Sequence, residues 1–499
     1  MAPAKSTRKS MPKVRTGCLT CKQRRIKCDE GKPSCRNCSR TGRRCEGYPT
    51  TQSATGNNDQ IQTRQARPIR VYNLPFKVPG SQADRQLLHF YCCEAAGGLT
   101  SFSDPTLWTR FILQRSYHQP VIRNSLVTVS ALYRDYLQNG NAIAKSAKIT
   151  AIQRIAKCHR QLRLHLRSPE ASPDTALVCT IFFSTFEAMI GDCASATRHL
   201  DNGLTLLKQC QATQRADDEL LPHLVNLFSR LDIHASTFDD ERIPIMTLTT
   251  EEEMLGAVHA VPTTISTLDE AETVLTKLQS WLMHHIIEHV QHKNKPLGEF
   301  PQGLLQQRFV LYQQFERFFF SFDILFDSLL GDVSHRGLLL RIQAQMYYAI
   351  LVENIPNHSA NPPFGPRLPV DRLQDTLVDI QTFLSLDVVE SATQNFTLSS
   401  QLVAILYFLC LKTCDPESKK LAFELLQHSR LPAKDGLWEA QKAISIIQAL
   451  MDQTCHYDGP GSLEQTGGDV FSLEEGGIEH VFRDLSTKYP EDESPDTPF

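Results

Sequence analysis

Residues 18–45 read CLTCKQRRIKCDEGKPSCRNCSRTGRRC and hold six of the 15 cysteines of this 499-residue chain. Their spacing is C-x2-C-x6-C, then six residues, then C-x2-C-x6-C again, so the stretch is an internal duplication. A tetrahedral zinc ion takes four ligands, and two ions therefore need eight coordination positions. Six thiolates fill eight positions only if two of them bind both ions. The spacing thus predicts a small domain held by two metal ions and a bridging pair of cysteines.

The bridging pair must occupy equivalent positions in the two halves, and spacing alone leaves three choices open: Cys18 with Cys35, Cys21 with Cys38, or Cys28 with Cys45. A zinc ribbon on four cysteines and a disulfide knot are the alternative interpretations. The ribbon leaves two thiols unexplained, and clustered cysteines in an intracellular chain favour metal binding over disulfides. Because a domain of about 30 residues buries little apolar surface, metal binding is expected to supply much of its folding free energy.

This cysteine pattern, with Lys32 and Pro33 between its halves, resembles the fungal Zn2Cys6 binuclear cluster family. The resemblance implies two Zn2+ ions as cofactors and a loop shaped by Pro33. It also implies that the first cysteine of each half, Cys18 or Cys35, binds both ions. It also implies which thiols complete each site: Cys21 and Cys28 for one ion, and Cys38 and Cys45 for the other.

Charge is distributed unevenly, with +11 over residues 1–50 and −9 over residues 456–499. The basic stretch of residues 1–50, called the head below, indicates an anionic partner, and double-stranded DNA is expected. Guanine presents N7 and O6 in the major groove, which Arg and Lys bind well. By resemblance, Arg24 and Arg25 contact the bases of a CGG-type triplet. The other nearby cations are expected to bind phosphates, namely Lys22, Lys27, Arg43 and Arg44. A solvated basic face or a nuclear import signal is the alternative interpretation.

The rest of the chain divides by composition. Residues 1–17 form a basic arm, and residues 18–48 form the zinc domain. Residues 49–82 contain four prolines and no heptads, which predicts a flexible linker in place of the coiled coil found in many relatives. Without a coiled coil, the protein either binds DNA as a monomer or forms a homodimer through the region that follows the linker. The N-terminus lacks a secretory signal and no apolar run is long enough for a membrane span, so an intracellular protein without a membrane partner is expected. Because the expected partner is DNA, the expected location is the nucleus.

Residues 83–455 show helical periodicity and predict an all-α body. Apolar positions recur at i, i+3 and i+4 over residues 121–137. Further helices are predicted at 85–95, 142–167, 174–190, 194–209, 218–233, 268–292, 303–330, 335–353, 371–385, 398–413, 417–428 and 436–452. Residues 177–207, with a Gly191-Asp192 turn, resemble the fungal transcription factor regulatory domain. The overall fold class is therefore mainly α.

Three features of the body suggest a further site. His285, Glu288 and His289 fit the HxxEH pattern of zinc peptidases, but no third ligand is identifiable. An aromatic stripe from Phe315 to Phe326 is more typical of a core than of an effector pocket. Scattered thiols, such as Cys92, are more typical of buried structural cysteines than of redox sensors.

Residues 456–499 alternate acidic and apolar side chains, which suits an activation segment that binds the transcription machinery. A solvated tail with one helix docked on the body is the alternative interpretation. Together with the resemblance, these features predict a nuclear RNA polymerase II transcription factor and not an enzyme. By resemblance, the protein is expected to activate a metabolic or secondary-metabolite gene cluster. The alternatives are a repressor or scaffold with the same head, or a zinc-dependent enzyme that uses the helical body.

Overall fold

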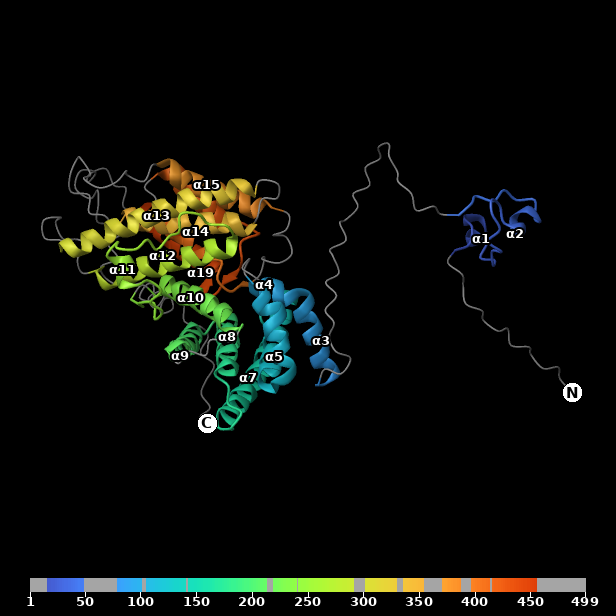
Figure 1. Cartoon of the computed structure of the whole chain (residues 1–499), viewed down its shortest axis with the longest axis horizontal. Helices are drawn as coiled ribbons and strands as arrows, with labels where there is room; N and C mark the ends of the chain where they lie inside the picture. Colours follow the sequence, from blue (N-terminus) through green and yellow to red (C-terminus); the bar gives the residue numbers. More distant parts are fainter. Residues whose placement is uncertain are drawn as a thin grey trace. The chain divides into compact units, whose positions relative to one another are not determined.

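The computed structural model describes residues 16–48, 79–100, 105–140, 142–212, 219–239, 241–290, 301–329, 335–353, 370–386, 396–412 and 415–455. The chain separates into two compact units, residues 1–69 and residues 70–499, which are described separately below. Figure 1 shows the small unit in dark blue and the large helical body in colours from lighter blue to red. Most of the expected basic arm, most of the linker and the whole acidic tail lie outside the described residues.

The small unit contains two short helices, α1 (Leu19–Gln23) and α2 (Arg36–Ser39). Helices of five and four residues do not persist alone in water because nucleation is unfavourable. Each begins at a cysteine whose sulfur accepts a hydrogen bond from the backbone amide three residues on, at Cys18 and Cys35. The interior of this unit consists of cysteines. The same side chains that cap the helices therefore form the core.

The elements described in the first half of the body are all helices. Its elements are α3 (Gln82–Phe90), the π-helical turn η1 (Tyr91–Ala95), α4 (Ala96–Thr100), the π-helical turn η2 (Leu107–Phe111), α5 (Ile112–His118), α6 (Pro120–Gln138), α7 (Lys145–Leu166), α8 (Pro173–Ile190), α9 (Cys193–Ala212) and α10 (Leu221–Phe238).

The second half adds eight helices and a small sheet within the described residues. The helices are α11 (Glu251–Met254), α12 (Leu268–Glu288), α13 (Gln302–Ser328), α14 (His335–Glu353), α15 (Val370–Ser385), α17 (Leu402–Lys412), α18 (Pro416–Leu426) and α19 (Ala440–Cys455). The strands are β1 (Phe396–Thr397), β2 (Lys434–Asp435) and β3 (Trp438–Glu439), in the order β1-β2-β3. β1 pairs parallel to β2, and β2 pairs antiparallel to β3.

The predicted mainly α fold is confirmed, and the differences are local. The predicted helix at 121–137 is α6, and the long predicted helices each have a counterpart within a few residues. The helices at 398 and 436 begin late, at Leu402 and Ala440, because strand residues precede them. η2 and α5 were not predicted, and neither were the strands. A strand of two residues is too short to produce a detectable alternation of apolar and polar positions.

The hairpin of α8 and α9 lies in the largest of three apolar clusters of the body. Gly191 ends α8 with a φ of 89°, a left-handed conformation that glycine adopts without strain. On α9, a Cβ at Gly203 would lie 2.5 Å from Phe228 Cε1 on α10. Only glycine therefore allows these helices to approach so closely. The Gly-Asp turn expected from the sequence is confirmed at this position.

By length and composition, one helix in the described part of the chain is apolar enough to cross a membrane, Pro173–Ile190. This helix is α8, and 67% of its residues are buried inside the body. Core helices of soluble proteins pass the same test, so the finding is weak evidence for a membrane span.

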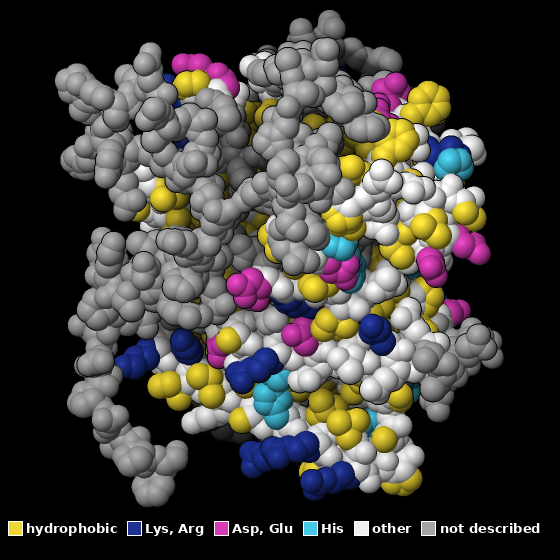
Figure 2. Space-filling model, turned by 90° about the vertical axis from the view of Figure 1, so that its left-hand side faces the viewer, with side chains coloured by type: hydrophobic (Ala, Val, Ile, Leu, Met, Phe, Trp, Pro, Cys, Tyr) yellow, Lys and Arg dark blue, Asp and Glu magenta, His cyan; other side chains and the backbone are white. Residues whose placement is uncertain are grey.

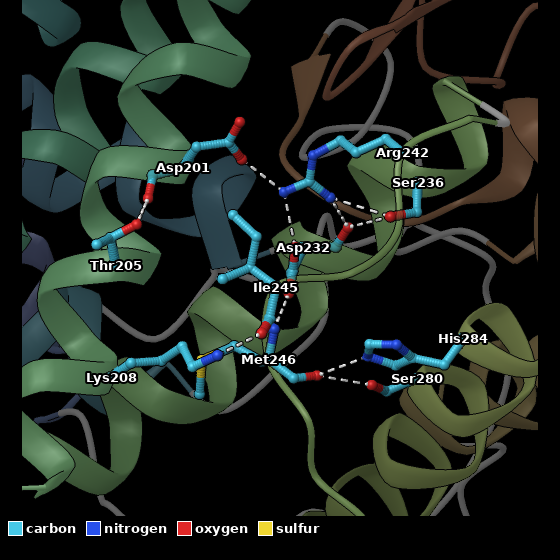
Figure 3. A network of polar contacts seen from close by, with 10 residues as sticks. All are labelled: Asp201, Thr205, Lys208, Asp232, Ser236, Arg242, Ile245, Met246, Ser280 and His284. Carbon is cyan, nitrogen blue, oxygen red and sulfur yellow. Dashed lines mark hydrogen bonds and ion pairs between the residues drawn. The ribbon is translucent and has the colours of Figure 1, made fainter. Parts of the chain in front are cut away.

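A network of ion pairs and hydrogen bonds connects the loop after α10 to the helices α9, α10 and α12 (Figure 3). The Arg242 guanidinium lies 2.6 Å from the Asp201 carboxylate of α9 and 2.7 Å from the Asp232 carboxylate of α10. The Met246 amide donates to Asp232 at 2.7 Å, and the Ser280 hydroxyl of α12 donates to the Met246 carbonyl at 3.0 Å. The network joins three helices to one loop.

Candidate metal centre and nucleic-acid interface

The six cysteines of the small unit come together as two sulfur groups. One group is Cys18, Cys21, Cys28 and Cys35, and the other is Cys18, Cys35, Cys38 and Cys45. Within each group all the Sγ atoms lie within 4.8 Å of one another, and the two groups share Cys18 and Cys35. Within the described residues these are the groups of three or more metal-ligating side chains that are close enough to share an ion.

The sulfur distances fit zinc better than disulfides. A Zn–S distance of about 2.3 Å places two ligand sulfurs of one tetrahedron about 3.8 Å apart. The Sγ atoms of Cys18 and Cys35 are 3.7 Å apart, and those of Cys21 and Cys35 are 3.6 Å apart. A disulfide would need about 2.05 Å. The disulfide interpretation therefore does not fit this structure.

The ribbon interpretation receives less support than two ions. Cys21 and Cys38, which belong to different groups, also have sulfurs 3.9 Å apart, so distances alone permit a site on the first two cysteines of each half. Such a site would leave Cys28 and Cys45 without an ion. Both thiols instead lie inside the two sulfur groups.

Burial and backbone hydrogen bonds shift the pKa values of the cysteine thiols in opposite directions. Desolvation raises the pKa of Cys18 to about 12 and also raises the pKa of Cys35. Cys28 is desolvated as well, but hydrogen bonds from the Cys18 and Glu30 amides outweigh that effect and lower its pKa to about 7. Zinc binds thiolates, so binding must displace protons from the buried thiols, and zinc affinity depends on pH.

Three side chains outside the cysteine set hold the two halves together. The Asp29 carboxylate accepts hydrogen bonds from the Arg36 and Asn37 amides at the start of α2, at 2.9 and 3.1 Å. The Tyr48 hydroxyl donates to the Gly31 carbonyl at 2.9 Å and lies 3.8 Å from the Cys28 sulfur.

Thr20 on α1 makes the third connection. Its hydroxyl donates to the Arg44 carbonyl at 3.2 Å and accepts from the Glu46 amide at 3.1 Å. The roles of Asp29, Tyr48 and Thr20 were not predicted from the sequence, because they depend on how the two halves of the domain face each other.

The predicted DNA-contacting cations lie in the same small unit as the sulfur groups. Five of the six are exposed, namely Lys22, Arg25, Lys27, Arg43 and Arg44, and Arg24 is half-buried. The Arg24 guanidinium donates to the Thr41 hydroxyl at 3.1 Å, which restricts its side chain. Arg36 and Arg40 are also exposed cations on and after α2. These two residues were not among the predicted DNA-contacting cations, and the duplication makes their positions equivalent to 19 and 23 of the first half.

The histidine motif of the body does not form a metal site. His285 is 4% exposed, and burial lowers its pKa to about 3. The His284 ring lies 3.6 Å from the Glu288 carboxylate and the His285 ring packs edge-on against His289, so the side chains have other contacts. This group is absent from the clusters of potential metal ligands in the described residues.

The aromatic stripe of α13 belongs to the core, as its spacing indicated. Phe315, Phe318 and Phe322 are fully buried, and the last two rings stack with centroids 5.3 Å apart. Cys92 is also buried. These residues contribute to packing.

Residues 16–55 match the family described as the fungal Zn(2)-Cys(6) binuclear cluster domain, and residues 86–287 match the fungal specific transcription factor domain. The two matches lie one after the other in the chain, the first over the small cysteine-rich unit and the second over the first half of the helical body. The cofactors of the cluster domain are two Zn2+ ions, and the sulfur geometry above suits them.

The aspercryptin biosynthesis cluster-specific transcription regulator atnN of Emericella nidulans is 25% identical over 358 residues, 65% of this chain and 55% of that protein. Transcription regulator lscL of Purpureocillium lilacinum is 26% identical over 226 residues, 40% of this chain and 50% of that protein. The chain thus spans about half the length of these two relatives. The transcriptional regulatory protein moc3 of Schizosaccharomyces pombe is 64% identical over 39 residues, 8% of each chain. No solved structure matches significantly.

Proposed function

We propose that this protein is a nuclear, zinc-dependent transcription regulator that binds specific DNA sequences. The observation that carries the proposal is the pair of four-sulfur groups, which share two cysteines and lie among exposed cations. A metal-held domain with a strongly basic surface suits nucleic acid, because neutralising phosphates releases counterions.

In this proposal all six cysteines are zinc ligands and Cys18 and Cys35 bridge the two ions. The shared membership of these two residues in both sulfur groups supports that assignment. Their sulfurs also cap α1 and α2, so the zinc ions would fix both helices. The zinc ions supply folding free energy and hold the short helices rigid for DNA binding.

Sequence reading is assigned to Arg24 and Arg25, with a CGG-type triplet as the target. Both follow α1 directly, and an arginine can donate two hydrogen bonds to one guanine. Thr41 holds one Nη of Arg24 and leaves the other donors of that guanidinium for a base. The phosphate contacts are assigned to Lys22, Lys27, Arg43 and Arg44, whose exposure supports that role.

Regulation is assigned to the parts beyond the zinc domain. The helical body over residues 83–455 would provide a homodimer interface if the protein dimerises, and residues 456–499 would contact the transcription machinery as an activation segment. The names of atnN and lscL describe transcription regulators, and atnN is named for a biosynthesis cluster, which supports activation of a metabolic gene cluster. A repressor or scaffold with the same head is the second candidate.

The test is selection of bound sites from a random DNA duplex pool by the full-length protein with zinc at physiological salt. Two CGG-like triplets at a fixed spacing would support sequence reading by a dimer, and a single triplet would support a monomer. An Arg25→Ala variant serves as the control. Absence of enrichment, or equal enrichment by the variant, would contradict sequence-specific binding.

A further inference from the structure

Helix α7 has an exposed face that combines cations with apolar side chains. Seven Lys or Arg residues and no Asp or Glu lie between residues 145 and 167, namely Lys145, Lys148, Arg154, Lys157, Arg160, Arg163 and Arg167. The buried side of the helix is marked by Ala151, Ile155 and Cys158. The exposed side includes Ile149, Ile152, Leu164 and Leu166, which are between 44% and 67% exposed. We call this exposed side the α7 face.

Most cations of the α7 face have no acidic partner among the described residues. Arg154 lies 3.8 Å from the Asp84 carboxylate, whereas Lys145, Lys157, Arg160 and Arg163 form no ion pair within the described part of the chain. Uncompensated like charges along one helix repel one another. Figure 2 shows that Lys and Arg side chains lie next to hydrophobic ones along the lower edge of one face of the molecule.

The chain itself contains a segment with the complementary chemistry. Residues 456–499 carry a net charge of −9, and their apolar side chains include Ile478, Val481, Phe482 and Leu485. These four positions follow the i, i+3, i+4 and i+7 spacing with which one face of a helix binds an apolar groove. Glu479 and Asp484 lie among them, and Glu474 and Glu475 come just before them. An acidic, amphipathic segment thus matches a basic surface that exposes isoleucines and leucines.

Chain length allows this contact. α19 ends at Cys455, which leaves 22 residues before Ile478. That length spans roughly 70 Å when extended, whereas a compact body of about 370 residues has a radius of gyration of about 21 Å. The segment can therefore reach the far side of the body.

We propose that residues 469–485 of this chain dock on the α7 face of the same molecule. The cations would pair with the acidic side chains, and the exposed isoleucines and leucines would be covered by Ile478, Val481, Phe482 and Leu485. Nucleic acid is a less suitable occupant, because phosphates would leave those apolar side chains exposed. The contact would hold the acidic tail against the body, and it does not depend on sequence reading by the zinc domain.

Carbodiimide cross-linking of the full-length protein tests the contact, because this reagent joins a lysine amine to a carboxylate only when they are adjacent. We expect products that link Lys145, Lys148 or Lys157 to acidic residues of 469–484, found by mass spectrometry. A mixture of isotopically light and heavy protein separates contacts within one chain from contacts between copies. Products that link the tail mainly to lysines elsewhere, or mainly link light to heavy chains, would overturn the proposal.

Hydrogen exchange with matched variants provides the second test. In the wild type we expect amides of 478–485 to exchange about tenfold more slowly than unprotected amides. Arg160→Glu with Arg163→Glu should remove that protection, and adding Glu475→Arg with Glu479→Arg should restore it. Lys420→Glu with Lys442→Glu reverses two exposed cations on α18 and α19 and should leave the protection unchanged. Unprotected amides in the wild type, or equal effects of both double variants, would overturn the proposal.

Discussion

Arg25 and Gly42 occupy equivalent positions in the two halves of the zinc domain, and both have a left-handed backbone, with φ of 55° and 65°. Each follows a short helix, and the next amide returns to the second cysteine of its half: Ile26 donates to the Cys21 carbonyl and Arg43 to the Cys38 carbonyl, both at 3.1 Å. The left-handed conformation costs a residue other than glycine about 1–2 kcal/mol. Gly42 makes this turn in the second half without that cost, whereas Arg25 makes it in the first half with the cost. The arginine at this position therefore indicates that its side chain has a role other than folding.

Replacing Arg25 with glycine should therefore separate folding from DNA reading. We expect the Arg25→Gly variant to retain or slightly raise the temperature at which the domain releases zinc, because the strained backbone is relieved. Affinity for a CGG-containing duplex should fall by about 1–3 kcal/mol while affinity for a scrambled duplex changes little. Fluorescence anisotropy on both duplexes measures this. Lys27→Ala is the control, and it should weaken both duplexes alike and reduce the salt dependence.

Chelation should unfold the zinc domain and leave the body folded. The three tryptophans of the chain, Trp108, Trp281 and Trp438, all lie in the body, so their fluorescence reports on that unit alone. We expect a strong chelator to release two zinc ions per chain and abolish DNA binding without shifting the tryptophan emission. Release of one ion per chain would contradict the two-site assignment.

Loss of the Tyr48 hydroxyl should weaken zinc binding. Burial, and then the neighbouring Cys28, raise the pKa of Tyr48, so its hydroxyl keeps its proton near neutral pH and can donate to Gly31. Groups that orient metal ligands typically contribute about 10–100-fold in metal affinity, and we expect the lower end for Tyr48→Phe. Competition with a chromophoric chelator measures the affinity. Tyr117→Phe alters an exposed tyrosine of the body and should have no effect.

The sequence predicted those parts of the protein that depend on local pattern. The cysteine duplication needs only spacing, and α6 follows from the recurrence of apolar residues between Val121 and Tyr136. The features that sequence analysis missed depend on partners distant in the chain. β1 forms because Phe396 pairs with Lys434, 38 residues away, and Tyr48 acts on Gly31 only after the two halves of the domain meet. Contacts between residues so far apart in the chain leave no pattern in the neighbouring sequence from which they could be predicted.

Removal of Arg242 should destabilise the body more than removal of an exposed arginine. The Asp232 carboxylate is 1% exposed and would be left buried without its ion-pair partner. Breaking one side of a buried pair costs about 3–5 kcal/mol, so we expect Arg242→Met to lower the free energy of unfolding by that order. Urea denaturation followed by tryptophan fluorescence measures it. Arg110→Met breaks the exposed pair with Glu219 and should cost about 1 kcal/mol or less, and similar losses in both variants would contradict the role of the network.

Acid should destabilise the body through His285. Burial lowers its folded-state pKa to about 3, below the ordinary value of 6.5, so the unfolded chain binds the proton more readily. The contribution of neutral His285 to stability is therefore intact above pH 6.5 and declines as the pH falls from 6.5 toward 3. Over that range the free energy of unfolding should fall by up to about 1.4 kcal/mol per pH unit from this residue. We expect His285→Gln, which cannot titrate, to flatten the dependence of the urea midpoint on pH. His428→Gln alters an exposed histidine and should leave the dependence as in the wild type, whereas an unchanged slope in His285→Gln would assign the acid sensitivity to other groups.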